Sequence, residues 1–369
     1  MKSLLKTPKR VATFAVSTLE NGGAVSDIER EVPCQTSILS ELLVCALFVL
    51  SECNALAQGV SQPVSATAAC TELNETVMTY VMNERFDQAE IALSSTQASS
   101  PRQPELFCAG QVLDNLSVLM ARSGRFAKAE LFAERSVKVL EKSYASDDPV
   151  LLLPLQMLAT TRFEQGKTAK AREAFRRMQS IRTERPEYRA LVSGTSAAFL
   201  LAAGRRREAE AAYFATLTAW REAGYRDTPF EGVILLSLVT LYGEEQRFDE
   251  ARQVLDRALA IFAHNKDTVP LDRATILSVQ AALHARLGEL REAERELADA
   301  LSILGREPHV DSIVLATVLT NYAQVLRKTH HRREARSVEA RASLLRRDQA
   351  SNVVVDVTDL LPEQKSRRN

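Results

Sequence analysis

Along most of this chain, apolar residues recur with the period of an α-helix, in pairs of segments separated by a short polar break. In the stretch 113–122, Leu113 and Leu116 lie on one face of an amphipathic helix. Gly124 follows, and glycine can take the left-handed conformation that ends a helix. A second helical pattern runs from about 126 to 142. The pattern therefore predicts two helices joined by a tight turn, a helical hairpin.

One alanine marks each copy of this pattern. The copies are 38 to 42 residues apart, and the alanines are Ala89, Ala129, Ala171, Ala209, Ala251, Ala293 and Ala335. Self-similarity at a fixed period is typical of a solenoid, in which each unit packs only on its neighbours. We interpret the alanine as the place where the two helices approach closest, because a larger side chain would push them apart.

Prolines separate the copies at positions 149, 186, 229, 270 and 308, where they fit a loop or the first turn of a helix. The sequence thus predicts an all-α, right-handed α-solenoid of about seven helical hairpins. Their expected spans are 70–98, 104–144, 149–183, 187–223, 229–264, 270–305 and 309–346, with the first acting as a cap. The β-branched run at 353–357 disfavours a helix, so we expect an extended or disordered tail over 347–369.

The best copy reads Leu113-Asp114-Asn115-Leu116, followed by Gly124-Arg125-Phe126-Ala127-Lys128-Ala129-Glu130. It resembles a tetratricopeptide repeat. The 42-residue period, longer than the usual 34, resembles the kinesin-light-chain-like branch of that family. The resemblance covers about 70–346 and implies the fold and a role in binding partner proteins. The tyrosine that the family carries in its first helix is kept only at Tyr80 and Tyr242.

Composition narrows the range of functions. Lys plus Arg equals Asp plus Glu, at 47 each, and aromatics make up only 6% of the chain. Neither the charge nor the aromatic content favours nucleic acid as a partner. We find no catalytic constellation, metal-ligand spacing or phosphate loop, and the histidines, including His330-His331, are isolated or adjacent on a turn. The sequence therefore predicts no enzyme, no cofactor, no metal site and no small-molecule substrate.

An apolar run at 42–51 is about ten residues long and precedes Ala55-Leu56-Ala57. It suits the apolar core of a secretory signal with a cleavage site before Gln58, and we assign the signal peptide to 36–57. Residues 1–35 would be a disordered extension or a mis-assigned start, and 58–69 a linker. Cleavage after Ala57 would give an exported protein, periplasmic or secreted. The alternatives are a buried helix of a cytoplasmic protein, or membrane association through a retained 38–57 segment.

Cys70 lies 19 residues before Ala89, and Cys108 lies 21 before Ala129. The two cysteines therefore occupy nearly equivalent places on the first helices of adjacent hairpins. A disulfide between them is plausible in an oxidising compartment. Two buried free thiols are the alternative.

In a solenoid the first helices line the concave face. In the family, a polar residue 14 positions before the alanine points into this groove. The first column consists of Glu75, Asn115, Met157, Thr195, Ser237, Val279 and Asn321. A second column lies seven positions further along the same helix face. It consists of Met82, Arg122, Glu164, Ala202, Glu244, Arg286 and Lys328.

Two pairs stand out in these columns, Asn115 with Arg122 and Asn321 with Lys328. An amide can bond both the N–H and the C=O of an extended peptide, and the cation can meet an acidic group. We add Thr195 to the proposed peptide-binding set, together with Ser237. Ordinary solvated groove residues are the alternative interpretation.

The sequence thus predicts a non-catalytic scaffold that binds a protein or peptide partner in the concave groove. The alternative function is a regulatory adaptor for a separately encoded signalling enzyme or protease.

Overall fold

The computed structural model describes residues 70, 72–77, 79–80, 85, 88–89, 91–92, 103–122, 124–265, 270–306 and 312–351. Its long helices are α6 (Gln103–Arg122), α7 (Phe126–Leu140), α8 (Leu152–Glu164), α9 (Thr168–Ser180), α10 (Pro186–Ala202), α11 (Arg206–Glu222), α12 (Pro229–Glu244), α13 (Phe248–His264), α14 (Pro270–Leu287), α15 (Leu290–Leu304), α16 (Ser312–Lys328) and α17 (Arg332–Ser351). A 3-10 turn, η2 (Pro149–Leu151), precedes α8.

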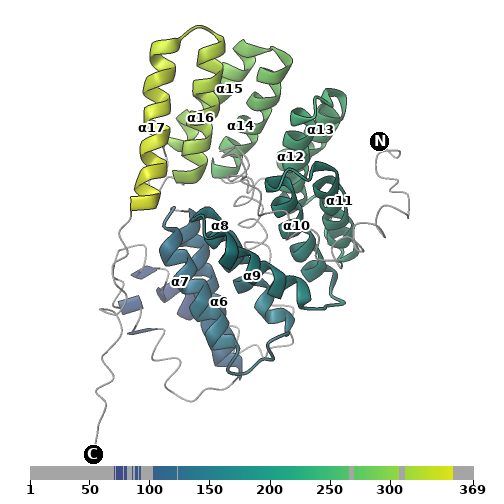
Figure 1. Ribbon diagram of the computed structural model, residues 1–369, viewed down its shortest axis with the longest axis vertical. Coiled ribbons are helices and arrows are strands. Elements are labelled where there is room, and N and C mark those ends of the chain that lie inside the picture. The colour runs from purple at the N-terminus through teal and green to yellow at the C-terminus, as the bar shows by residue number, and fades with distance from the viewer. Residues whose placement is uncertain are drawn as a thin grey trace, which may run out of the picture.

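These helices pack as successive hairpins. Each odd-numbered helix from α7 to α17 lies against the helix before it, and neighbouring hairpins also touch, for example α12 with α14 and α14 with α16. Figure 1 shows the pairs following one another along an arc from α6 to α17. The predicted all-α array of hairpins is confirmed. The predicted first hairpin, 70–98, lies largely outside the described residues.

Helix starts follow the prolines. Pro186, Pro229 and Pro270 each occupy the first residue of a helix, where the missing N–H costs no hydrogen bond. Thr228 caps α12 by accepting a hydrogen bond from the Glu231 N–H at 3.3 Å. The last helix, α17, ends at Ser351 rather than at 346 as expected, because the β-branched run that disfavours a helix begins only at Val353.

The turn inside each hairpin uses one backbone conformation. The residue five positions before the marker alanine has a positive φ, at Gly124, Gly166, Gly204 and Gly288. Two copies have a side chain there instead, Gln246 with φ 59° and His330 with φ 67°. Glycine adopts this left-handed region without a steric cost, whereas other residues pay one.

The marker alanines are buried, none more than 4% exposed. In six of the seven hairpins a small residue also lies 19 positions earlier, at Cys70, Gly110, Ala190, Gly232, Ala274 and Ala316, whereas the third hairpin has Leu152 there. A Cβ on Gly232 would lie 2.7 Å from the Phe262 ring, and one on Gly110 would lie 2.6 Å from Leu140. Close packing of a hairpin therefore uses a small residue on the second helix, the marker alanine predicted from the sequence, and another on the first helix, which the sequence analysis did not single out.

Candidate functional site: a groove on α12, α14 and α16

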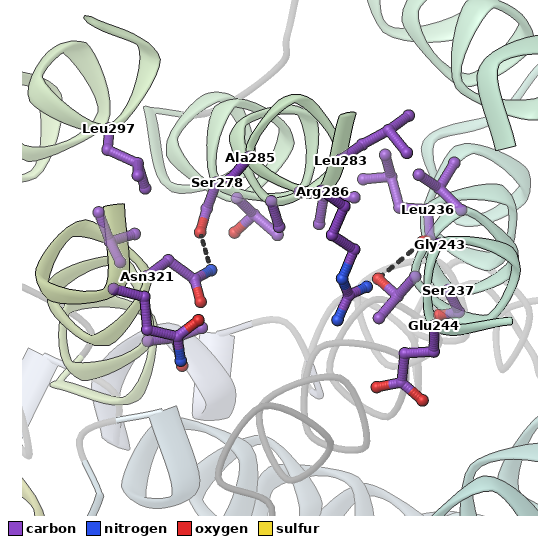
Figure 2. Close-up of a pocket in the computed structure, with 18 of the residues that line it drawn as sticks. Leu236, Ser237, Gly243, Glu244, Ser278, Leu283, Ala285, Arg286, Leu297 and Asn321 are labelled. Carbon is purple, nitrogen blue, oxygen red and sulfur yellow. Dashed lines mark hydrogen bonds between the residues drawn. The ribbon is translucent and has the colours of Figure 1, made fainter. Parts of the chain in front are cut away.

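The first helices of three successive hairpins, α12, α14 and α16, line a groove of about 790 Å³ (Figure 2). Both residue columns assigned to the concave face reach it in all three hairpins: Ser237, Val279 and Asn321 from the first column, and Glu244, Arg286 and Lys328 from the second. Aliphatic side chains fill much of the remaining wall, among them Val233, Leu236, Leu283, Val314, Val318 and Val325. These aliphatic side chains are almost fully buried, and polar side chains such as Thr240, Thr275 and Gln324 also line the groove. The groove is therefore of mixed polarity, with charged groups at defined points.

Arg286 is the cation in the middle of the groove. Its side chain extends from α14 toward α12 (Figure 2) and is exposed. It makes no hydrogen bond or ion pair with any described residue. Gly243 of α12 gives it room, since a Cβ there would lie 3.1 Å from Arg286 Nη1. A cation held in a channel without a partner can bind an anionic group of a ligand.

The other two charges of the groove have partners in the protein. Arg206 Nη2, from the hairpin before, lies 3.3 Å from Glu244 Oε2, and the Glu244 side chain is only 10% exposed. Lys328 Nζ donates to the Ala285 carbonyl at 3.0 Å while its side chain stays exposed. Since Arg206 compensates the carboxylate, the excess charge of the groove is positive.

Asn321 has a structural contact in addition to its place in the groove. Its Nδ2 donates to Ser278 Oγ of the preceding hairpin at 3.0 Å (Figure 2). Asn115 makes the equivalent contact at the other end of the array, where its Nδ2 donates to Asn74 Oδ1 at 2.8 Å. Both amides thus join neighbouring hairpins. The carbonyl and second N–H of Asn321 remain for a ligand.

The structure brings three of the six predicted peptide-binding residues together, Ser237, Asn321 and Lys328. Asn115 and Thr195 do not line this groove; Thr195 is buried and its hydroxyl donates to the Leu191 carbonyl at 2.9 Å. Ser237 likewise donates to the Val233 carbonyl at 3.3 Å. Arg122 ends α6, and its side chain lies outside the described part of the chain.

Arg286 is the groove residue that the sequence analysis undervalued. It belongs to the second column, but only the two pairs of an asparagine with a cation were selected, and the first-column residue of its hairpin is Val279. The feature that could have selected it is Gly243, a glycine inside an apolar helical pattern. Such a glycine weakens a helix by about 1 kcal/mol relative to alanine and so suggests a packing reason.

A half-buried carboxylate, Glu164, lies on α8, two hairpins before the groove. Glu164 belongs to the second column, and its Oε1 is closed off from solvent without a hydrogen-bond partner. Burial raises the pKa of Glu164 to about 8. The equivalent first-column residue, Met157, is fully buried. This hairpin therefore contributes to the core rather than to the groove described above.

Cys70 and Cys108 form a disulfide with Cα atoms 5.3 Å apart. His284 Nδ1 lies 2.8 Å from Glu296 Oε2, and His330 is an exposed turn residue.

Among the described residues, no group of three potential ligands is placed to hold a metal ion. In the same part of the chain, no helix combines the length and apolar character needed to cross a membrane.

No family model matches the chain, and no curated protein matches it. Several solved structures are similar to it. A tetratricopeptide repeat protein from Parabacteroides merdae is 14% identical, covering 77% of this chain and 98% of that one with a TM-score of 0.47. BtubC (BKLC) from P. vanneervenii is 20% identical, covering 65% and 92% with a TM-score of 0.42.

Kinesin light chain repeats from Podospora anserina are 17% identical, covering 63% of this chain and 92% of that one with a TM-score of 0.30. The structural neighbours of the chain are thus tetratricopeptide-repeat proteins, including kinesin-light-chain-like ones, as the sequence resemblance predicted.

Proposed function

We propose that the chain is a non-catalytic scaffold that binds an extended segment of a partner protein in the groove on α12, α14 and α16. The observation that carries the proposal is Arg286, an exposed cation in the middle of the groove that has no hydrogen-bond or ion-pair partner among the described residues. An extended peptide can place an acidic group on this guanidinium and aliphatic side chains on the walls. Asn321 would bond the peptide backbone.

Selection from a displayed library of random peptides, using the full-length chain as bait, tests this proposal. We expect the selected peptides to combine acidic and aliphatic residues. The double substitution Arg286→Ala/Lys328→Ala should weaken their binding at least ~10-fold, since hydrogen bonds to charged groups contribute about 1.5–3 kcal/mol.

The matched control is Arg291→Ala/Arg333→Ala. These arginines are exposed on α15 and α17 of the same two hairpins and do not line the groove. Binding that falls equally in both double variants, or in neither, would contradict the groove as the binding site.

We further propose that the chain is exported, with 36–57 as its signal, and that cleavage after Ala57 leaves a mature protein that starts at Gln58. The cleavage site and the whole 1–69 segment lie outside the described residues. The Cys70–Cys108 disulfide supports this proposal, because structural disulfides persist in oxidising compartments. Intact-mass measurement of the native protein, with and without thiol alkylation, tests it. A start at Gln58 with no alkylated cysteine is expected; an intact N-terminus with two reactive thiols in the mature region would refute it.

A further inference from the structure

The groove matches a segment of the chain itself. After α17 ends at Ser351, the sequence continues Asn352, then Val353-Val354-Val355-Asp356-Val357-Thr358-Asp359-Leu360-Leu361-Pro362-Glu363. This segment, 353–363, is aliphatic with three acidic residues and no basic one. The groove presents partly exposed apolar side chains at Val279, Ala282 and Ala285, and it has an excess of positive charge from Arg286 and Lys328. The two are therefore complementary in both apolar character and charge.

The attachment point brings the segment to one end of the groove. The turn at 329–331 makes α17 antiparallel to α16, so the end of α17 returns to the start of α16. That start carries Val314 and Val318, which line the groove. Figure 1 shows the end of α17 at this side of the last hairpin.

The length of the segment suits the distance it would cover. Eight residues separate Ser351 from Asp359 and span up to ~27 Å when extended. Lys328 lies 14 positions after Val314 on α16, or about 21 Å along the helix axis. Asp359 can therefore reach Lys328. Glu363, four residues further, can reach Arg286 on α14, about 10 Å to the side.

We propose that residues 353–363 occupy the groove intramolecularly and thereby compete with the partner segment. In this arrangement the acidic side chains Asp359 and Glu363 meet Lys328 and Arg286, and the aliphatic side chains of the segment lie along Val279, Ala282 and Ala285 of α14. This inference rests on the proposed function, because it assigns a regulator to the same groove. An intramolecular occupant competes at an effective concentration of ~1 mM. Even a segment with low affinity for the groove therefore excludes partner peptides of low affinity.

The test uses a fluorescent peptide with the sequence 352–363 and the full-length chain in two forms. One form is native, and in the other residues 353–363 are scrambled without a change of composition. We expect fluorescence anisotropy to show binding to the scrambled form and at least ~10-fold weaker binding to the native form. Adding Arg286→Ala/Lys328→Ala to the scrambled form should abolish binding, whereas Arg291→Ala/Arg333→Ala should leave it unchanged.

Equal binding to both forms would overturn the intramolecular contact, and so would absence of binding to either. A native form that becomes dimeric as its concentration rises, while the scrambled form stays monomeric, would overturn it in favour of exchange between two copies. Hydrogen exchange at 314–328 gives a second readout, and protection should be lower in the scrambled form. If library peptides still bind in the groove while the 352–363 peptide does not, the proposed function stands and this inference fails.

Discussion

Lys167 Nζ lies 2.6 Å from Glu130 Oε2, joining the turn of one hairpin to the second helix of the hairpin before it. The same two repeat positions form an ion pair again where Arg247 Nη2 lies 3.0 Å from Glu210 Oε1. A third pair has the acidic and basic residues exchanged between the two positions, where Arg252 Nη2 lies 3.0 Å from Glu289 Oε1. A recurring cross-hairpin ion pair thus joins successive hairpins at these three junctions.

One junction is built differently. Between the third and fourth hairpins the corresponding positions are Arg172 and Arg205, which are both basic. There Phe199 stacks on Phe175 with ring centroids 4.7 Å apart and meets Phe163 edge-on at 5.3 Å. Aromatic packing takes the place of a pair of opposite charges at this junction.

We predict that Glu130→Gln destabilises the protein by about 2 kcal/mol, since Glu130 accepts charge-assisted hydrogen bonds in a largely buried place. Burial raises the pKa of Glu130, but hydrogen bonds from Lys167, Arg162 and Gln165 outweigh it, so that the pKa lies below its ordinary value. The stabilisation is therefore present above the unfolded-state pKa of about 4.5 and is lost as the pH falls through the folded-state pKa.

Urea unfolding of both proteins between pH 3 and pH 7 measures this effect. The control is Glu222→Gln, which removes an exposed pair with Arg189 and should cost less than ~1 kcal/mol. Equal losses in the two variants, or a loss for Glu130→Gln that grows toward low pH, would show that the buried pair does not stabilise the junction.

Asp114 gives the opposite pH dependence. Its side chain is buried between α6 and α7, and its Oδ1 has no hydrogen-bond partner. Burial raises the pKa of Asp114 from 3.8 to about 8, although a hydrogen bond with Ser136 opposes the shift. The folded state therefore holds a proton that the unfolded state releases above pH 3.8, and stability falls as the pH rises from about 4 to 8.

We predict that Asp114→Asn stabilises the protein relative to the wild type by an amount that increases from pH 5 to pH 8, because the amide cannot ionise. Thermal unfolding across this pH range provides the measurement. Asp256→Asn, at an exposed position of α13, should give a difference that does not change with pH. A stabilisation by Asp114→Asn that is constant with pH would mean that burial does not hold the proton.

Asn321→Ala should lower the free energy of unfolding by about 1 kcal/mol, because it removes the hydrogen bond to Ser278. A double-mutant cycle with Ser278→Ala separates this contact from the loss of peptide binding. We expect the two substitutions to be non-additive by about 1 kcal/mol in stability. Additive losses would mean that the two side chains are not coupled, so that Asn321 acts on the ligand alone.

His330→Gly should stabilise the last hairpin by about 1 kcal/mol, since His330 has φ 67° and glycine removes the strain of that conformation. Asp256→Gly, inside α13, should instead destabilise by ~0.3 kcal/mol, because glycine is a weaker helix former than aspartate. Urea unfolding of the two variants and the wild type measures these differences in the free energy of unfolding. If both are destabilised to the same degree, the left-handed turn does not limit stability.

The sequence by itself determined the helical hairpins, their order and the face that each residue takes on its helix. The marker alanines and the turn glycines specify where two helices touch and where the chain reverses, and these are local requirements. For the same reason, both groove columns of α12, α14 and α16 could be predicted from spacing, including Ser237, Asn321 and Lys328.

Only the tertiary structure decided which charges in the groove are available to a ligand. Arg206 neutralises Glu244 from 38 residues away, and Asn321 bonds to Ser278 across a hairpin boundary. Arg286 has no hydrogen-bond or ion-pair partner in the described part of the chain. These outcomes depend on the rotation and offset between neighbouring hairpins, which helical periodicity does not specify. Spacing selects the face of a helix, whereas packing between hairpins selects the partner of each side chain on it.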